Sequence, residues 1–467
     1  MPATIPPGSI PGSNTPAHAL CNDLGPIEYR VPADLRTYAK NPRKHSQKQL
    51  VKLMASIREF GFTLPVLIDA DDLIIAGEAR VTAAKTLDLA QVPVLVADGW
   101  SEAKIRAYRL ADNRLAELAE WDKDALAIEL AAIIEFDETP IDILGWETAE
   151  IDLILDDPES ETAGGNENDP ADEQLALPSN PVSRTGDLWL LGPHRLLCGS
   201  SLDPDDWSAL LDGETAAMAF TDPPYNVPVS GHVCGLGKVQ HEEFAMASGE
   251  MTKPEFTTFL SGFIAAMLPH LKDGAVLDIC MDWRHLGELQ ASIDGNGLSL
   301  LNLCTWNKAN GGMGSLYRSK HELIFIAKKG KAPHTNNVEL GKHGRYRTNV
   351  WDYAGVNSFG KTRMSDLADH PTVKPVALVA DAIRDVTHPG EIVLDAFMGS
   401  GTTILAAERT KRRGLGIEIA PAYVDTAIRR WQKLTGAEAV LASNGQSFAD
   451  ITEERLQPAD AATAAAA

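Results

Sequence analysis

The chain has 467 residues, with 44% hydrophobic and 23% charged residues, which are ordinary values for a globular protein of two or three domains. No apolar run approaches the ~18 residues that a membrane span requires, and the N-terminus lacks the apolar core of a signal peptide. Five scattered cysteines without a Cys-x-x-Cys pair favour a reducing cytoplasm and argue against a zinc site. We therefore expect a cytoplasmic protein with no membrane partner and no metal.

The net charge of −23 is unevenly distributed along the chain. Between Lys308 and Arg363 the sequence has eleven Lys and Arg against three Asp and Glu. Between Glu147 and Glu173 it has many acidic residues and no Lys or Arg. A local basic segment on an acidic protein can still bind phosphate, so the overall charge does not exclude a nucleic-acid partner.

The first 118 residues predict a disordered tail followed by a compact α+β domain. Residues 1–25 are rich in Pro, Gly and Ser, a composition typical of disorder. Residues 26–118 alternate short apolar runs with two long stretches of helical periodicity, Gln47–Phe60 and Ala103–Leu118. We expect this domain to combine a small sheet with helices.

Two charged motifs in this domain stand at predicted turns, Asn41-Pro42-Arg43 and Gly77-Glu78-Ala79-Arg80. Both resemble segments of the N-terminal domain of ParB-like partition proteins, with Ala79 where those proteins have a second Arg. A charged motif at a helix start is a candidate contact to phosphate or DNA. The alternative is that Arg43, Glu78 and Arg80 form a structural ion-pair network.

The next segments predict a helical extension, a linker and a second, larger domain. Residues 119–155 have helical character and become increasingly acidic. Residues 156–181 combine acids with Gly and Pro, a composition typical of a self-repelling flexible linker. Residues 182–440 alternate strand and helix patterns, and residues 441–467 are expected to be a C-terminal tail. Because the linker would separate the two cores, a fragment of roughly residues 182–455 is expected to fold alone.

The larger domain contains Asp222-Pro223-Pro224-Tyr225 directly after Ala216–Phe220, an apolar run that predicts a buried strand. The end of a parallel strand is the usual ligand site in an open α/β sheet. Proline has no N–H, so the loop offers two acceptors, the Asp222 carboxylate and the Pro223 carbonyl, which suit an amino group with two hydrogens. Tyr225 adds a flat ring on which a base can stack. The alternative is a rigid turn with an exposed acid.

A Gly-rich turn joins a predicted strand to a predicted helix, with candidate ligand contacts at Asp395, Phe397, Gly399, Gly401 and Thr402. Such a turn lets a ligand approach the backbone closely at a helix N-terminus. A second predicted strand ends at Glu418, whose carboxylate can bind two ribose hydroxyls, as in other nucleoside-binding α/β folds. No Lys follows the glycines, so a P-loop is not expected.

In chain order, these motifs resemble the beta class of S-adenosylmethionine-dependent DNA amino-methyltransferases. The tetrad Asp222 to Tyr225 comes first, His370-Pro371-Thr372-Val373-Lys374-Pro375 follows, and the glycine turn comes last. The resemblance covers roughly residues 182–440 and implies an α/β fold, a Rossmann-like sheet with helices on both faces. Asp at the first tetrad position resembles the adenine-modifying members, whereas enzymes acting on cytosine more often carry Ser. Ala396 and Ser200 depart from the Pro and Asp common at those places.

The resemblance also implies which residues act. The tetrad would bind and stack an adenine flipped out of double-stranded DNA. Thr372 and Lys374 would lie near the methionine end of S-adenosylmethionine, while the glycine turn and Glu418 would hold the rest of that cofactor. The alternatives are a helix cap for Thr372 and a surface charge for Lys374.

The basic segment 308–363 lies between the two sets of motifs, where beta-class relatives carry their target-recognition region. It mixes Gly-rich turns and aromatic residues with four candidate DNA contacts, Arg318, Lys320, Arg345 and Arg347. Arg345 and Arg347 are two apart on an extended stretch and would face one side of a strand. The alternative is that the basic residues form a solvated face and that Trp351 and Tyr353 belong to the core.

The residues leave more than one function open. The first is methylation of adenine in DNA, by a chain that could act as a homodimer, with cytosine as the other amino-bearing target. The second is a ParB-like DNA-binding regulator whose methylase body is degenerate. The third keeps the chemistry but acts on RNA or a protein amide, although relatives of that kind usually have Asn in place of Asp222.

Overall fold

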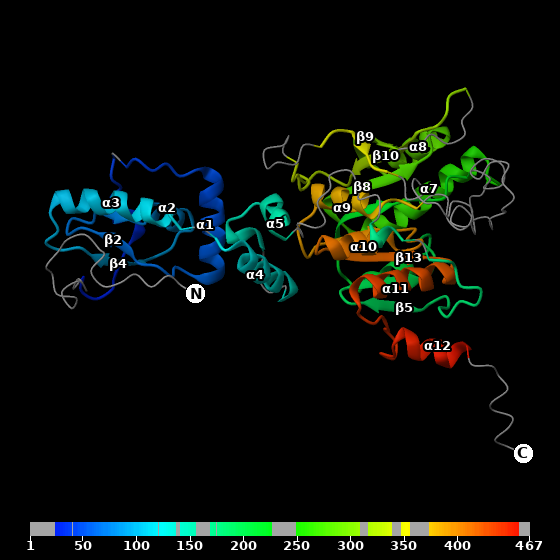
Figure 1. Ribbon diagram of the computed structural model, residues 1–467. Coiled ribbons are helices and arrows are strands. Elements are labelled where there is room, and N and C mark those ends of the chain that lie inside the picture. Colours follow the sequence, from blue (N-terminus) through cyan, green and yellow to red (C-terminus); the bar gives the residue numbers. More distant parts are fainter. Residues whose placement is uncertain are drawn as a thin grey trace, which may run out of the picture. The chain divides into compact units, whose positions relative to one another are not determined.

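The structure is a computed structural model, which describes residues 24–39, 41–119, 121–136, 141–155, 169–173, 175–226, 249–308, 316–338, 347–354 and 373–456. The chain divides into two compact units (Figure 1). Unit 1 comprises the residues up to Leu126 together with Glu138–Trp146, and unit 2 comprises Ala127–Asp137 together with the residues from Glu147 onwards. No helix in the described ranges is long and apolar enough to cross a membrane.

Unit 1 is an α+β domain built on a four-stranded sheet in the order β1-β4-β2-β3. β2 runs parallel to β4, while β1 and β3 are antiparallel to their neighbours. The strands and helices are β1 (Glu28–Arg30), α1 (Gln47–Phe60), β2 (Val66–Ile68), β3 (Ile74–Ala76), α2 (Glu78–Thr86), β4 (Val92–Val96) and α3 (Glu102–Ala116). Both long helices predicted from the sequence are confirmed, and α1 has the predicted bounds.

The two charged motifs of unit 1 bind neighbouring polar groups of the same unit. Glu78 accepts a hydrogen bond of 2.7 Å from the side chain of Asn41, and Arg43 donates one of 2.6 Å to Asn113. Arg80 instead donates to the carbonyl of Leu64 at 2.6 Å. The motifs therefore fasten the starts of α1 and α2 to other parts of the domain.

Unit 2 is an α/β domain (Figure 1). Its ten-stranded sheet has the order β11-β9-β10-β8-β7-β12-β13-β6-β5-β14. The five central neighbours from β8 to β6 run parallel, whereas β10 and β5 pair antiparallel at either side of them. The strands are β5 (Leu188–Leu191), β6 (His194–Cys198), β7 (Ala216–Thr221), β8 (Leu271–Met281), β9 (Ser299–Asn307), β10 (His321–Lys328), β11 (Val350–Asp352), β12 (Ile392–Asp395), β13 (Arg413–Glu418) and β14 (Val440–Leu441).

Helices cover both faces of this sheet, and each face has its own apolar core. Met218 and Phe220 of β7 pack with α9, α10 and α11, while Ala219 between them packs with α6, α7 and α8. The helices are α6 (Pro204–Leu211), α7 (Lys253–Met267), α8 (Leu286–Gly295), α9 (Val376–Val386), α10 (Thr402–Arg409), α11 (Pro421–Thr435) and α12 (Phe448–Leu456). The predicted Rossmann-like fold with helices on both faces is therefore confirmed.

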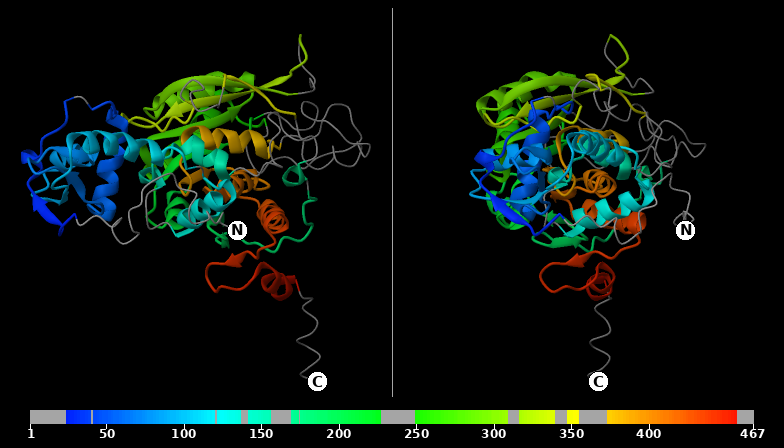
Figure 2. Two further views of the ribbon diagram at one scale, coloured as in Figure 1. Left: turned by 60° about the vertical axis from the view of Figure 1, so that its left-hand side comes forward. Right: turned by 90° about the vertical axis from the view of Figure 1, so that its left-hand side faces the viewer.

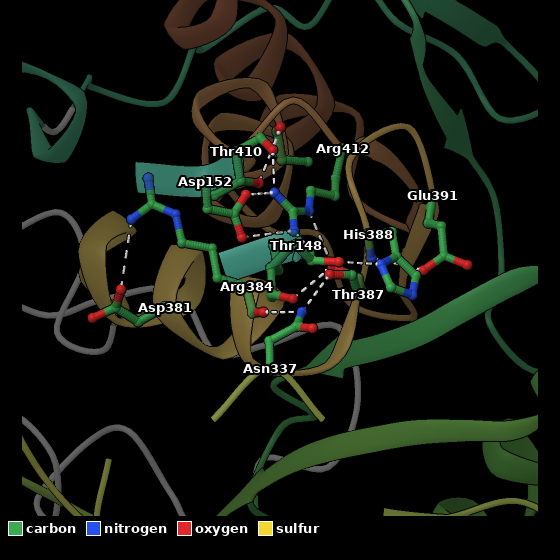
Figure 3. A network of polar contacts seen from close by, with 12 residues as sticks. Thr148, Asp152, Asn337, Asp381, Arg384, Thr387, His388, Glu391, Thr410 and Arg412 are labelled. Atoms are coloured by element: carbon green, nitrogen blue, oxygen red, sulfur yellow. Dashed lines mark hydrogen bonds and ion pairs between the residues drawn. The ribbon is translucent and has the colours of Figure 1, made fainter. Parts of the chain in front are cut away.

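The segment before this domain contains α4 (Lys123–Phe136) and α5 (Thr148–Leu155), as the predicted helical extension required. α5 is fastened to the domain by a buried ion pair between Asp152 and Arg412 (Figure 3). The guanidinium also donates to the Thr410 carbonyl at 2.6 Å and to the Thr387 carbonyl and hydroxyl at 2.8 and 3.1 Å. All five guanidinium N–H groups thus have an acceptor.

Residues 169–173, which were expected to be linker, lie against the same domain. Asp169 forms an ion pair with Arg409, and Arg430 donates to the carbonyl of Ala171 at 2.7 Å. Acids that repel one another along the chain are here neutralised by arginines of the domain. The larger unit therefore begins well before residue 182. Of the other predicted linker residues, 156–168 and 174 lie outside the described ranges.

Residues 441–456 also differ from the expected tail. β14 pairs with β5, and α12 follows it (red in Figure 2). Phe448 of α12 packs edge to face on the buried Trp189, with ring centroids 5.3 Å apart, and Arg455 forms an ion pair with Asp187. These contacts make α12 part of unit 2.

Candidate active site

Three acidic side chains lie along one edge of the sheet because three neighbouring parallel strands end there. Asp222 follows β7, Asp395 ends β12 and Glu418 ends β13. In the registers, Leu394 lies opposite Ala219 and Asp395 lies opposite Gly416. The Thr221 hydroxyl accepts a hydrogen bond of 3.3 Å from Ala396, which joins the tetrad loop to the glycine turn. This edge is the ordinary ligand site of an open α/β sheet.

Hydrogen bonds to Asp395 fix the backbone of the glycine turn between β12 and α10. Its carboxylate accepts hydrogen bonds from the Thr403 hydroxyl at 2.6 Å and from the Phe397 amide at 3.0 Å. Gly401 has φ of 89°, and a Cβ there would lie 2.8 Å from the Cβ of Ala427, so the position requires glycine. Burial raises the pKa of Asp395 to about 7. The predicted strand–turn–helix is confirmed, with Asp395 shaping the turn.

Glu418 reaches back to the glycine turn from the end of β13. One carboxylate oxygen accepts from the Gly399 amide and the other from the Ala420 amide, each at 2.8 Å. Burial raises the pKa of Glu418, although these amides oppose the shift. A carboxylate has about four acceptor positions, so two remain for the hydroxyls of a ribose.

The tetrad loop presents Asp222 to solvent and fixes the following residues. The Asp222 side chain is 27% exposed. Asn226 has φ of 52°, donates to the Met251 carbonyl at 2.8 Å and accepts from the Gly249 amide at 3.0 Å. It thereby holds together the two ends of the chain segment that follows the tetrad.

A buried cluster of opposite charges lies behind Asp222. The Lys374 ammonium group lies 2.5 Å from an oxygen of Asp222 and 2.6 Å from an oxygen of Glu322. The second oxygen of Glu322 lies 2.7 Å from the ammonium group of Lys308. The Tyr225 hydroxyl contacts both carboxylates, Asp222 and Glu322. Two ammonium groups and two carboxylates thus balance in charge.

The two carboxylates of this cluster differ in proton affinity. Burial raises the pKa of Asp222, and the Lys374 ammonium group opposes that shift without cancelling it. Burial acts in the same direction on Glu322, but the ammonium groups of Lys374 and Lys308 outweigh it and lower the pKa of Glu322. Burial lowers the pKa of Lys374, but the two carboxylates outweigh that effect and raise it. Asp222 is therefore both the more basic carboxylate and the more exposed one.

The remaining predicted site residues fall into three groups. Thr402 begins α10 and Phe397 packs on Phe263, with ring centroids 5.0 Å apart, so both support the glycine turn. Arg318 and Lys320 are exposed. Thr372 and Arg345 lie outside the described residues.

Arg347 does not have the exposure expected of a DNA contact. Its side chain is 16% exposed, and it donates to Asp385 at 2.8 Å and to the Tyr353 hydroxyl at 2.7 Å. Trp351 and Tyr353 are buried in the core, as the alternative interpretation held. Arg347 is thus assigned a structural role, because two acids of α9 and a tyrosine engage its guanidinium.

Sequence reasoning missed Glu322 and Lys308 as site residues. Glu322 lies at the start of β10, and β10 is antiparallel to β8, so its first residues lie where the parallel strands end. Lys308 directly follows β9, the other neighbour of β10. The sequence did contain a signal for both residues. An acid stands at the start of the predicted strand His321–Ala327, and a lysine stands just after the preceding predicted strand.

Comparisons with known proteins agree with this geometry. Residues 216–429 match the DNA methylase family of the N6/N4 type. Residues 28–120 match the ParB N-terminal domain, and residues 124–185 match the ParB-methyltransferase HTH domain. The HTH match covers the segment predicted as helical extension and linker.

Two curated proteins and one solved structure are similar to this chain. Type II methyltransferase M2.MboI of Moraxella bovis is 27% identical over 241 residues, which are 49% of this chain and 85% of that protein. Type II methyltransferase M2.DpnII of Streptococcus pneumoniae is 29% identical over 228 residues, which are 46% of this chain and 82% of that protein. A crystal structure of an M1.HpyAVI–SAM complex aligns with a TM-score of 0.38 and 22% identity, over 50% of this chain and 97% of that one. Residues 216–429 are therefore a domain of the N6/N4 DNA methylase type, and a ParB-like N-terminal domain precedes it at residues 28–120.

Proposed function

We propose that this chain transfers a methyl group from S-adenosylmethionine to the exocyclic amino group of adenine in double-stranded DNA. The observation that carries the proposal is the Asp222 carboxylate, which is partly exposed at the sheet edge and lies one strand away from the glycine turn. The match of residues 216–429 to the N6/N4 DNA methylase family supports methylation of an amino group in DNA.

The residues beside the tetrad fit S-adenosylmethionine. Glu418 would accept hydrogen bonds from the ribose hydroxyls, and the turn through Gly401 lets a ligand approach the backbone at the start of α10. When bound, the cofactor supplies a methyl group already activated by a positively charged sulfur.

Asp222 would hold the target amine in line with that methyl group. The amino group donates one N–H to the Asp222 carboxylate and the other to the Pro223 carbonyl, which fixes the direction of attack. These acceptors bind the nitrogen more strongly as it becomes positive, so they stabilise the transition state more than the ground state. The nitrogen would form the new N–C bond with the methyl carbon that the cofactor supplies, and the electron pair of the broken carbon–sulfur bond would stay on sulfur. The surplus N–H proton passes to Asp222.

A paired adenine must first leave the duplex, which costs about a few kcal/mol. The ring of Tyr225 would stack on the flipped base, and the contacts of its hydroxyl with Asp222 and Glu322 would hold that ring in one orientation. Arg318 and Lys320, which are exposed in the basic segment, are the proposed phosphate contacts.

Nucleoside mass spectrometry tests this proposal. Unmethylated duplex DNA is incubated with the full chain and S-adenosylmethionine, and the digested nucleosides are analysed. We expect N6-methyladenine. N4-methylcytosine would correct the base, because the cytosine amino group offers the same two N–H donors. The absence of any methylated base, with DNA binding retained, would instead favour a ParB-like regulator.

A further inference from the structure

We propose that Glu322 is a positioning residue for methyl transfer, because it shares the Lys374 ammonium group with Asp222 and so leaves Asp222 able to accept the target amine. This inference rests on the proposed function. Glu322 is not expected to touch the base or the cofactor itself. Its side chain is 6% exposed and lies behind Asp222 and Tyr225.

The geometry shows a cation held between two acids. Lys374 lies 2.5 Å from Asp222 and 2.6 Å from Glu322, and its own side chain is 4% exposed. A buried ammonium group has to be paired, since an uncompensated charge in the interior is costly. If Asp222 were its sole partner, the pair would occupy the oxygens that the amine needs. Glu322 takes part of this pairing and leaves acceptor positions on Asp222.

Lys308 explains why Glu322 can do this without itself becoming protonated. The Lys308 ammonium group lies 2.7 Å from the second oxygen of Glu322. It also lies 4.6 Å from the centre of the Trp306 ring, which further restricts its position. Glu322 therefore stays ionised between two ammonium groups, and the cluster stays balanced in charge.

The same charges act on the proton affinity of Asp222. Burial raises the pKa of Asp222, the Lys374 ammonium group lowers it, and the Glu322 carboxylate raises it. The other titratable groups facing this cluster are the Tyr225 hydroxyl, the Lys308 ammonium group, the Cys280 thiol and the Asp395 carboxyl group at the end of the neighbouring strand β12. Removing the charge of Glu322 should therefore lower the pKa of Asp222, and removing the charge of Lys308 should raise it.

The opposite directions of these two shifts provide the test. Single-turnover methyl transfer to duplex DNA is measured from about pH 5 to about pH 9 with the full chain, with Glu322→Gln and with Lys308→Gln. Activity requires ionised Asp222. Asp395 titrates in the same pH range, so the movement of the acid limb between variants, rather than its absolute position, reports the change in the pKa of Asp222. We expect Glu322→Gln to lower the rate plateau by about 10- to 100-fold and to move the acid limb to lower pH. We expect Lys308→Gln to move the acid limb to higher pH.

Glu322→Asp keeps the charge and serves as the conservative variant. It should recover part of the rate and leave the acid limb near its wild-type position, while the affinity for S-adenosylmethionine stays unchanged in all three variants. An unaltered rate in Glu322→Gln, or a lower rate with an unmoved acid limb in both Gln variants, would overturn the positioning role. Should Glu322→Gln fail to fold, the direction of the Lys308→Gln shift decides alone. Absence of methyl transfer by the wild-type chain would overturn the proposed function as well, so the two failures are distinguishable.

Discussion

In the described part of unit 2, Lys374 and Arg412 are both buried and bound by carboxylates, but the exposure of their carboxylate partners differs. All five N–H groups of Arg412 have acceptors (Figure 3). Asp152, its acidic partner, has a side chain that is 5% exposed. Lys374 is equally buried, but its partner Asp222 is 27% exposed. Arg412 directly precedes β13, whereas Asp222 directly follows β7, so they lie at opposite edges of the sheet.

This contrast teaches that burial and ion pairing do not by themselves mark a reactive site. A closed pair fastens one element to another, as Arg412 fastens α5 to the domain. A pair with one acceptor open to solvent at the carboxyl ends of parallel strands can exchange a partner for a ligand. Substitutions in the two clusters should therefore separate stability from chemistry.

The largest effect is expected for Asp152→Asn. The amide keeps the shape of the carboxylate but leaves the Arg412 charge uncompensated in the interior, which should lower the free energy of unfolding by about 3–5 kcal/mol. Denaturant titration of the full chain measures this loss. Glu173→Gln is the matched control, because its ion pair with Lys433 is about half exposed and should contribute at most ~1 kcal/mol. Equal losses in both variants would contradict the anchoring role of Asp152.

Truncation also tests whether the residues before 182 stabilise unit 2. A fragment that starts at residue 182 lacks Asp152, Asp169 and Ala171, which bind Arg412, Arg409 and Arg430. We now expect this fragment to be less stable than one that starts at residue 147 and keeps α5. The midpoints of thermal unfolding of the two fragments provide the comparison, and equal midpoints would restore the boundary predicted from the sequence.

Asp222→Asn should give the next largest effect, and it should change the rate of methyl transfer without changing stability. The amide is a weaker acceptor than the carboxylate and cannot take up the surplus proton, so the rate should fall by about 10²–10³-fold. The affinity for S-adenosylmethionine and the unfolding midpoint should stay near their wild-type values. Asp205→Asn, an exposed acid in the first turn of α6, is the control and should leave the rate unchanged.

Glu418→Ala is expected to act on the cofactor. Loss of charge-assisted hydrogen bonds to the ribose should weaken binding of S-adenosylmethionine by about 1–3 kcal/mol. Glu418 also accepts hydrogen bonds from the amides of Gly399 and Ala420, so its loss could destabilise the glycine turn. The midpoint of thermal unfolding of the Glu418→Ala variant is therefore compared with that of the wild-type chain. Calorimetry that finds unchanged affinity would move the ribose contact to another residue.

The smallest effect should come from exposed cations. If Arg318 and Lys320 each contact a phosphate, the double Ala variant should flatten the salt dependence of DNA affinity by nearly one log unit per contact. Lys433→Ala, an exposed lysine outside the basic segment, is the control. An unaltered salt slope in the double variant would remove this pair from the DNA interface.

Much of the site could be predicted because its residues lie in contiguous motifs. The tetrad, the glycine turn and Glu418 each follow a strand whose apolar run is visible in the sequence, and the structure brings these strands side by side. Short motifs report local backbone shape well. Through the family that they resemble, they also implied a Rossmann-like sheet with helices on both faces.

The rest depended on long-range pairing that no local pattern records. Asp152 and Arg412 are 260 residues apart, and Glu322 and Tyr225 are 97 apart. Asp169 was interpreted as part of a linker, because its partner Arg409 lies 240 residues further along the chain. Arg347 had the sequence context of a DNA contact, and only the fold shows that Asp385 of α9 engages it.

The rate of methyl transfer in a single turnover, measured for Asp222→Asn and Asp152→Asn at a temperature where both are folded, tests the central claim most directly. We predict that Asp152→Asn transfers the methyl group at a rate within about threefold of wild type, while Asp222→Asn is slower by about 10²–10³-fold. A comparable loss in both variants, or full activity in Asp222→Asn, would contradict the distinction between an anchoring pair and a reactive one.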